Sequence, residues 1–92
     1  MEMNWDYFSA MQGKAFRVDC AEEPVTLTLE TAQRFDLSPR EGGSFRLEFR
    51  GPLEPVLAQD IHKFSADGEA FDMFIVPIRR DPTAMVYEAI FN

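Results

Sequence analysis

The sequence predicts a mainly β fold: a small antiparallel six-stranded sandwich or partly open barrel with one short N-terminal helix. Short segments in which apolar and polar residues alternate with a period of two indicate half-buried strands. Turns that contain Gly or Pro separate these segments at short spacing, as is typical of small all-β domains. The length of 92 residues suits one domain, and we expect a single domain over residues 1–92.

The N-terminal segment has the pattern of a short amphipathic helix over about residues 5–12. Asn4 is suited to cap its start, because the side chain can accept a hydrogen bond from a free amide of the first turn. Gly13 is a natural stop. Large apolar residues follow one another at helical spacing, namely Trp5, Phe8 and Met11. Two turns of helix are not stable alone in water, so we expect this helix to dock on the rest of the protein.

Six segments have the pattern expected of strands. They are residues 16–20, 25–30, 45–50, a weaker segment at 58–65, 71–78 and 85–91. Asp67-Gly68 predicts a two-residue hairpin turn before the fifth strand, because both positions need a positive φ. Pro77 predicts a bulge or a free amide edge in that strand, because proline cannot donate a hydrogen bond to a ladder.

The least regular part of the chain is residues 31–43. Ser38-Pro39 and Gly42-Gly43 mark a surface loop there. We expect this whole segment to lie outside the sheet, with Phe35 and Leu37 tucked beneath it.

The fifth strand has apolar residues on both of its faces. One set is expected to face the core, namely Phe71, Met73 and Ile75. The other set points to the opposite side of the sheet and needs a cover: Phe74, Val76 and Ile78. We favour the N-terminal helix as that cover, because a helix so short needs a surface on which to dock. The competing hypothesis leaves this second face open as an apolar patch that serves as a dimer or partner interface.

The charge balance disfavours several classes of partner. Sixteen acidic and nine basic residues give a net charge of −7, which argues against nucleic acid and against an anionic membrane surface. No apolar run approaches the ~20 residues of a membrane span, and the first residues lack the pattern of a signal peptide. We expect a cytoplasmic protein that is a monomer or a weak homodimer.

Candidate chemistry is sparse. Asp60 could in principle orient His62, the single histidine, but i and i+2 on a strand do not line up as a triad, so we interpret His62 as a solvent-facing strand residue. Cys20 is the single cysteine, which excludes an internal disulfide, and it does not make a zinc site with one histidine. Three acids near the hairpin turn lack the spacing of a calcium loop, namely Asp67, Glu69 and Asp72. We therefore predict no catalytic residue, no metal site and no cofactor.

Arg46 and Arg50 lie on one face of the third strand. The plainer interpretation is cross-strand pairing with outward-facing acids such as Glu30, Glu48 or Glu88. The alternative is an anion-binding or partner-docking patch. Four residues are therefore candidate partner contacts: Arg46, Arg50, Phe74 and Val76.

Three segments together resemble a bacterial family of unknown function. They are Phe49-Arg50-Gly51-Pro52, then Met73-Phe74-Ile75-Val76-Pro77-Ile78, and the final Tyr87-Glu88-Ala89-Ile90-Phe91-Asn92. The sequence departs from the family pattern at Asp60, where a turn-forming glycine is expected, and at Ile61, which replaces an aromatic residue. The resemblance implies a stand-alone small β domain without catalytic residues, encoded near phage tail-collar or tail-fibre-like proteins.

These observations favour a non-catalytic interaction or assembly module, acting as an accessory to a larger complex such as a phage-tail-like particle. The alternative is a small-ligand-binding β-barrel protein that uses its interior or its mouth. An enzyme is the least favoured class.

Overall fold

The computed structural model describes residues 4–20, 23–35 and 44–91. The elements in chain order are α1 (Trp5–Ala10), β1 (Ala15–Val18), β2 (Val25–Phe35), β3 (Ser44–Gly51), β4 (Asp60–Ala66), β5 (Glu69–Arg80) and β6 (Met85–Phe91). All strand pairs are antiparallel, and they close into a barrel in the order β1-β2-β3-β6-β5-β4. The fold is thus mainly β, as predicted, and it is a barrel rather than a sandwich.

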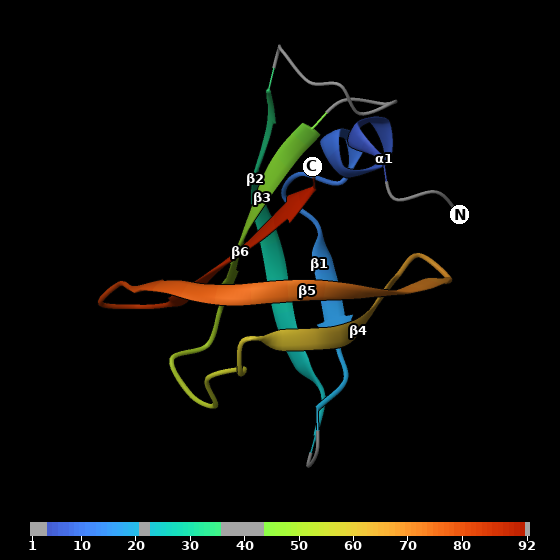
Figure 1. The fold of residues 1–92 in the computed structure, drawn as a ribbon. Helices are drawn as coiled ribbons and strands as arrows, with labels where there is room; N and C mark the ends of the chain where they lie inside the picture. Colours follow the sequence, from blue (N-terminus) through green and yellow to red (C-terminus); the bar gives the residue numbers. More distant parts are fainter. Residues whose placement is uncertain (1–3, 21–22, 36–43, 92) are drawn as a thin grey trace.

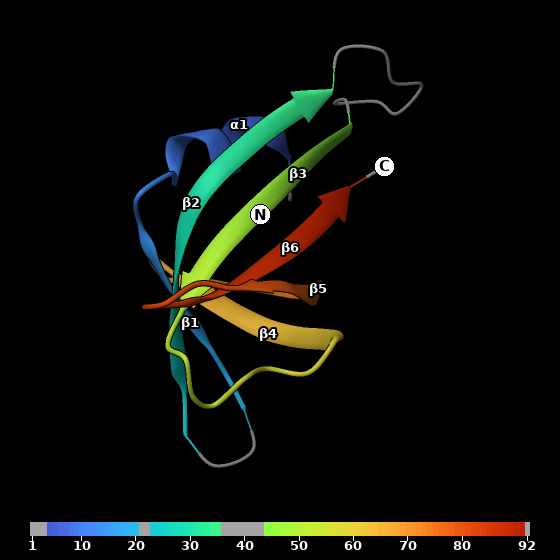
Figure 2. The ribbon, with the colours of Figure 1, turned by 90° about the vertical axis from the view of Figure 1, so that its left-hand side faces the viewer.

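The barrel is built from strands that cross one another. β5 runs across the direction of β2 and β3, with β4 beside it (Figure 1). β5 also changes partner along its length, because Glu69–Ile75 pair with β4 whereas Val76–Arg80 pair with β6. Within the described residues β1 and β4 join through two residue pairs, Arg17 with Ser65 and Val18 with Phe64. The second view shows the curved sheet of β2, β3 and β6 rising away from the β4–β5 hairpin (Figure 2).

The barrel interior is filled by side chains. The alternation along the strands places fully buried rings there, and Phe16, Phe49 and Phe64 contact one another with centroids 5.3–6.3 Å apart. Tyr87 is also fully buried, and its hydroxyl accepts a hydrogen bond of 2.8 Å from the amide of Leu57. This bond ties the segment after β3 to β6. The predicted inward faces of these strands are therefore confirmed.

Gly51, the last residue of β3, stands where the core leaves no room for a side chain. A Cβ atom at this position would collide with the side chain of Leu27 in the core. The Phe-Arg-Gly-Pro segment thus needs glycine where β3 crosses close to β2, and Pro52 follows outside the strand.

The helix α1 begins at the predicted residue and ends two residues before the predicted end. The amide of Tyr7 donates to Oδ1 of Asn4 at 3.0 Å, which is the expected N-cap. The helix ends at Ala10 rather than at residue 12. Gly13, at φ +84°, donates from its amide to the carbonyl of Leu29 at 2.7 Å, so the stop also joins the helix to β2.

The prediction that α1 covers the second face of β5 is wrong. Phe8 is fully buried, and its ring packs at 5.8–6.4 Å against four core rings, those of Phe16, Phe45, Phe71 and Phe91. The helix lies against β2 and β3 and closes one end of the barrel (Figure 2). At that end of the barrel, rings from four strands surround Phe8. The second face of β5 is a single sheet surface, which could contact only one side of the helix.

Two other expectations are corrected. Thr31–Phe35 continue β2 and pair with Glu48–Ser44 of β3, after a bulge that follows Leu29, so this part of the expected loop is strand. Phe35 is 38% exposed and is not tucked under. Leu37, Ser38-Pro39 and Gly42-Gly43 lie outside the described residues. Cys20 also lies beyond the end of β1.

The two local predictions around β5 are confirmed. Asp67 and Gly68 have φ values of 49° and 81°, as the hairpin turn requires. The register between β5 and β6 shifts between Pro77 and Arg79, which is the expected bulge.

Among the described residues, the helix is far too short to cross a membrane.

Candidate interaction surface

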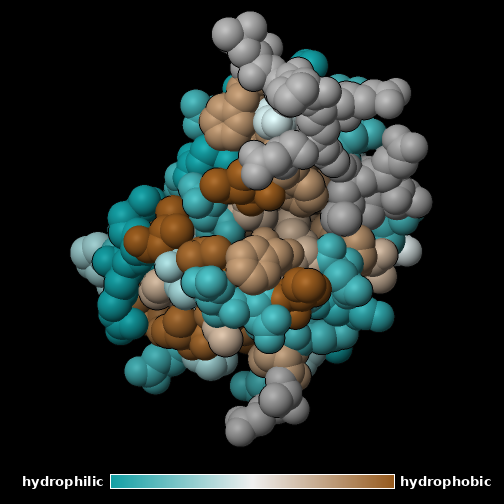
Figure 3. Space-filling view, in the orientation of Figure 1, coloured by the Kyte–Doolittle hydropathy of each residue, from teal (hydrophilic) through white to brown (hydrophobic). Residues whose placement is uncertain are grey.

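Large apolar side chains are exposed or half-buried on the outer face of β4, β5 and β6. We call them the apolar patch, and its members are Ile61, Phe74, Val76, Ile78 and Ile90. Ile61 is 62% exposed and Phe74 is 50% exposed. These two residues stand directly opposite each other across the β4–β5 pair. The space-filling view looks onto this face and shows apolar side chains gathered over β5 and its neighbours (Figure 3).

Strand alternation puts these residues outside. Met73 and Ile75 point into the core and are buried, so Phe74 between them must point outward. Val76 is half-buried and pairs with Glu88 of β6, and Ile90 stands two residues further along the same outer face. The patch therefore spans three strands.

The neighbouring outer face of β3 and β6 carries an ionic network, which consists of Arg46, Glu48, Glu88 and Arg79. Nη2 of Arg46 lies 2.6 Å from Oε2 of Glu48 and 2.7 Å from Oε2 of Glu88. Arg79 reaches Oε1 of Glu48 at 3.5 Å. The side chains of Arg46, Glu48 and Glu88 are 16–23% exposed. These three side chains are thus packed down on the barrel, whereas the side chain of Arg79 is 48% exposed.

The network shifts the titration of its members. The hydrogen bond from Arg46 holds the pKa of Glu48 below its usual value, against the opposing effect of burial. Burial alone would lower the pKa of Arg46, but the hydrogen bonds to Glu48 and Glu88 raise it. Both groups are therefore held in their charged forms.

Arg50 is engaged in the same way by other acids. Its Nη1 lies 2.7 Å from Oδ2 of Asp81, and its Nε lies 3.2 Å from Oε2 of Glu30. Hydrogen bonds from Arg50 and then Arg79 lower the pKa of the Asp81 carboxyl. The predicted cross-strand pairing with Glu30 and Glu88 is confirmed, whereas Glu48 pairs with Arg46 along the same strand. The charges of Arg46 and Arg50 are thus balanced within the chain.

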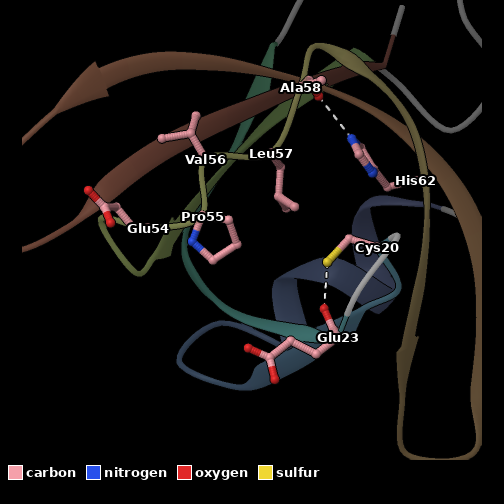
Figure 4. Close-up of a pocket in the computed structure, with 8 residues that line it drawn as sticks. All are labelled: Cys20, Glu23, Glu54, Pro55, Val56, Leu57, Ala58 and His62. Atoms are coloured by element: carbon pink, nitrogen blue, oxygen red, sulfur yellow. Dashed lines mark hydrogen bonds between the residues drawn. The ribbon is translucent and has the colours of Figure 1, made fainter.

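A pocket of about 660 Å³ lies at the mouth of the barrel opposite α1 (Figure 4). The segment before β4 and the end of β1 enclose it, and its lining consists of Cys20, Glu23, Glu54, Pro55, Val56, Leu57, Ala58 and His62. Nε2 of His62 lies 2.8 Å from the carbonyl oxygen of Ala58, and the thiol of Cys20 donates to the carbonyl of Glu23. Both potentially reactive side chains are therefore occupied by backbone carbonyls.

Asp60 does not orient His62. Its Oδ1 accepts a hydrogen bond of 2.7 Å from the adjacent amide of Ile61. His62 is half-buried at the pocket wall instead of facing solvent, which differs from the prediction. Within residues 4–20, 23–35 and 44–91, no group of three or more His, Cys, Asp or Glu side chains could hold a metal ion.

Comparison with known families gives one match. The family model of a domain of unknown function (DUF6916) covers residues 3–91, which is nearly the whole chain. The chain belongs to the DUF6916 family. No curated protein and no solved structure matches it. The family assignment agrees with the resemblance to a family of unknown function and adds no activity.

In this DUF6916 chain the partner contacts predicted from the sequence include two of the five members of the apolar patch. Phe74 and Val76 were predicted as partner contacts and both lie on it, whereas Arg46 and Arg50 lie in ion pairs beside it. Ile61 was missed because β4 was weakly defined by its pattern. The predicted turn held the signal, since counting outward from Asp67-Gly68 in a two-residue hairpin brings Ile61 opposite Phe74.

Proposed function

We propose that the protein is a non-catalytic interaction module that docks another protein chain on the apolar patch. The observation that carries this proposal is the exposed cross-strand pair of Ile61 and Phe74. Contiguous apolar side chains on a small domain often mark a protein–protein interface. A partner that covers Ile61 and Phe74 would remove their apolar surface from water, and this burial would favour binding.

The surroundings of the patch support the same function. Protein interfaces commonly have an apolar centre and a polar rim. Here the ionic network borders the patch, with Val76 next to Glu88 and Ile90 next to Arg46 in the strand registers. Because Arg46 is already held by two carboxylates, the rim is ordered before a partner arrives, so docking costs less side-chain entropy.

The setting we propose is accessory assembly of a larger particle of the phage-tail type. This part of the proposal comes from the resemblance to proteins encoded near phage tail-collar and tail-fibre-like proteins. A small β domain with one apolar face suits attachment to such a particle.

A photo-crosslinking amino acid at position 74, introduced in the native host, tests the function. We expect adducts to another protein chain, because the side chain at 74 lies within the contact. The matched control places the same amino acid at Thr26, an exposed outward position of β2 that pairs with Arg17 of β1. Equal adduct yields at 74 and 26, or none at 74, would contradict the proposal.

The pocket at the barrel mouth favours a second candidate function, which is binding of a small ligand. Its volume of about 660 Å³ lies within the range of ligand sites, and its lining combines apolar groups with two carboxylates. Native mass spectrometry of protein purified from its host would then show a bound small molecule, and Val56→Trp would displace it. Protein that carries no ligand, or carries it unchanged in the Val56→Trp variant, would exclude this site.

A further inference from the structure

β5 has one edge that no other strand of the described chain covers along its first half. Glu69–Ile75 pair with β4, whereas the ladder between β5 and β6 ends where Val76 stands opposite Glu88. Beyond that point β6 follows β3 and rises away from β5 (Figure 1). Within the described residues, the edge of β5 that faces away from β4 is therefore unpaired over residues 70–74.

The register of the hairpin identifies the backbone groups on this edge. Glu69 follows the two-residue turn and stands opposite Ala66, so these two residues form a hydrogen-bonded pair. Hydrogen-bonded and non-hydrogen-bonded pairs alternate along two antiparallel strands. Ala70, Asp72 and Phe74 are therefore the residues whose N–H and C=O groups point away from β4.

A hydrogen bond on the far side of β4 agrees with this alternation. Lys63 stands opposite Asp72, and its carbonyl oxygen accepts a hydrogen bond of 3.0 Å from the amide of Asp19. Lys63 is thus bonded toward the side of β1, and the backbone of Asp72 points in the opposite direction. Ala70, Asp72 and Phe74 are all exposed, so the edge is open to solvent.

The chemistry beside the edge specifies what kind of strand would fit there. Phe74 belongs to the apolar patch, and Asp72 lies two residues before it on the same outer face. Residues 60–75, which form the hairpin, contain four acidic residues and one lysine. Within the described parts of the chain, Asp67, Glu69 and Asp72 form no ion pair. A complementary strand therefore carries a basic side chain near the turn and an apolar side chain beside Phe74.

We propose that an extended basic segment of another protein adds to this edge of β5 as a further antiparallel strand, which rests on the proposed function. The added strand takes the course that β6 would follow if it continued beside β5 beyond Val76. Its backbone forms hydrogen bonds with the free N–H and C=O groups of Ala70, Asp72 and Phe74. Its outward side chains place an apolar group beside Phe74 and a guanidinium or ammonium group beside Asp72.

The charge of the edge favours such a partner over a second copy of this chain. If two copies joined through this edge in antiparallel directions, with residues 70–74 of each strand side by side, Asp72 would stand opposite Asp72 of the other copy. Like charges directly opposite each other are destabilising in a sheet. A basic strand instead gains an opposite-charge pair at the same position.

Amide hydrogen exchange, measured by nuclear magnetic resonance with and without a peptide probe, tests the added strand. The probe is acetyl-Thr-Val-Thr-Arg-Thr-Val-Thr-amide, which places valine opposite Phe74 and arginine opposite Asp72. In the free protein, the amides of Ala70, Asp72 and Phe74 should exchange faster than those of Phe71 and Met73, which face β4. With the probe at ten times its dissociation constant, exchange at the three edge amides should slow about tenfold.

Two matched controls separate backbone pairing from side-chain contact. The same peptide, N-methylated at its valines and arginine, keeps the side chains but loses the amides that face β5, and it should bind at least ~10-fold more weakly. Asp72→Pro removes an N–H that makes no bond to β4 and should weaken binding of the probe about tenfold. Asp72→Asn removes only the charge and should weaken it about threefold. Both variants should keep the wild-type thermal transition, because position 72 is exposed.

A probe that does not bind at millimolar concentration would overturn strand addition. So would bound probe that leaves the exchange of the edge amides unchanged, or affinity that N-methylation does not alter. The crosslinker at position 74 then decides the proposed function separately. Adducts that persist unchanged in the Asp72→Pro variant would show that another protein docks on the apolar patch without adding a strand, whereas a wild-type chain without adducts would refute both proposals.

Discussion

Two neighbouring regions of the outer barrel surface differ in how their side chains are satisfied. Over β3 and β6, Arg46 bridges Glu48 and Glu88, and these side chains are mostly covered. Over β4 and β5, Ile61 and Phe74 are half or more exposed to solvent. Among the residues that the structure describes, the first region has ion-pair partners, whereas the second has apolar side chains that stay exposed.

The difference follows from what each residue type needs. A guanidinium and a carboxylate on adjacent strands satisfy each other, so the ionic region gains nothing further from a partner. An apolar side chain on the outer face of a sheet can be satisfied only by another layer. Since α1 packs at the end of the barrel, it leaves this apolar surface exposed, and we propose that another chain supplies the layer.

The largest effect is expected from removing the strand that the two regions share. β6 pairs with β3 over its whole length and with β5 over part of it. Deleting residues 87–92 removes the buried Tyr87, its hydrogen bond to Leu57 and a row of ladder bonds. Because losing one large core side chain costs about 3–5 kcal/mol of a typical 5–15 kcal/mol, we expect an unfolded or insoluble chain. A cooperative thermal transition near the wild-type temperature would contradict the role of β6.

A matched pair of phenylalanines distinguishes core from patch. Phe64 is fully buried and Phe74 is half exposed, and they lie on adjacent strands. Phe64→Ala should lower the free energy of unfolding by about 3–5 kcal/mol. Phe74→Ala should change it by less than ~1 kcal/mol in the monomer. Urea denaturation at low protein concentration measures both, and equal losses would show that Phe74 is structural.

The ionic network should contribute a smaller amount. Arg46→Ala leaves Glu48 and Glu88 directly opposite each other without their shared cation. We expect a loss of about 1–3 kcal/mol in unfolding free energy. The control is Arg17→Ala, whose ion pair with Asp19 has exposed side chains at 3.7 Å and should be worth less than ~0.5 kcal/mol. Similar losses at Arg46 and Arg17 would mean that the network adds no stability.

The smallest effect is a pH dependence that arises from Glu48. Its pKa is lower in the folded chain than the ordinary value of 4.5, chiefly through the hydrogen bond from Arg46. Its contribution to stability is therefore fully present above about pH 4.5 and is lost as the pH falls through the lower folded pKa. Thermal melts of Glu48→Gln should show a shallower loss of stability in that window than the wild type. Parallel curves would show that Glu48 is not coupled to folding.

The sequence predicted features that depend on neighbours in the chain. The period of two identified the inward faces of the strands, and Asn4, Asp67-Gly68 and Pro77 identified a cap, a turn and a bulge. Barrel closure could not be predicted, because it depends on the long-range pairing of Val18 with Phe64.

The docking site of α1 was missed for a similar reason. The pattern of Trp5, Phe8 and Met11 shows that the helix needs an apolar surface, but it does not choose between two such surfaces. Only the closed barrel brings Phe71 and Phe91 together at one end, where Phe8 fills the space between strands. Because α1 packs at the end of the barrel, it does not cover the second face of β5, and Phe74 stays exposed there.

Nuclear magnetic resonance of the amides during titration with a hydrophobic dye tests most directly whether the two regions differ as described. With rising dye concentration, the amide signals of Ile61, Phe74 and Ile90 should shift together along one binding curve, because these side chains are exposed. Those of outward residues on β1 and β2, such as Arg17 and Thr26, should stay fixed. Signals that do not shift at all, or shifts centred on β1 and β2, would contradict the claim that the apolar patch is an accessible apolar surface.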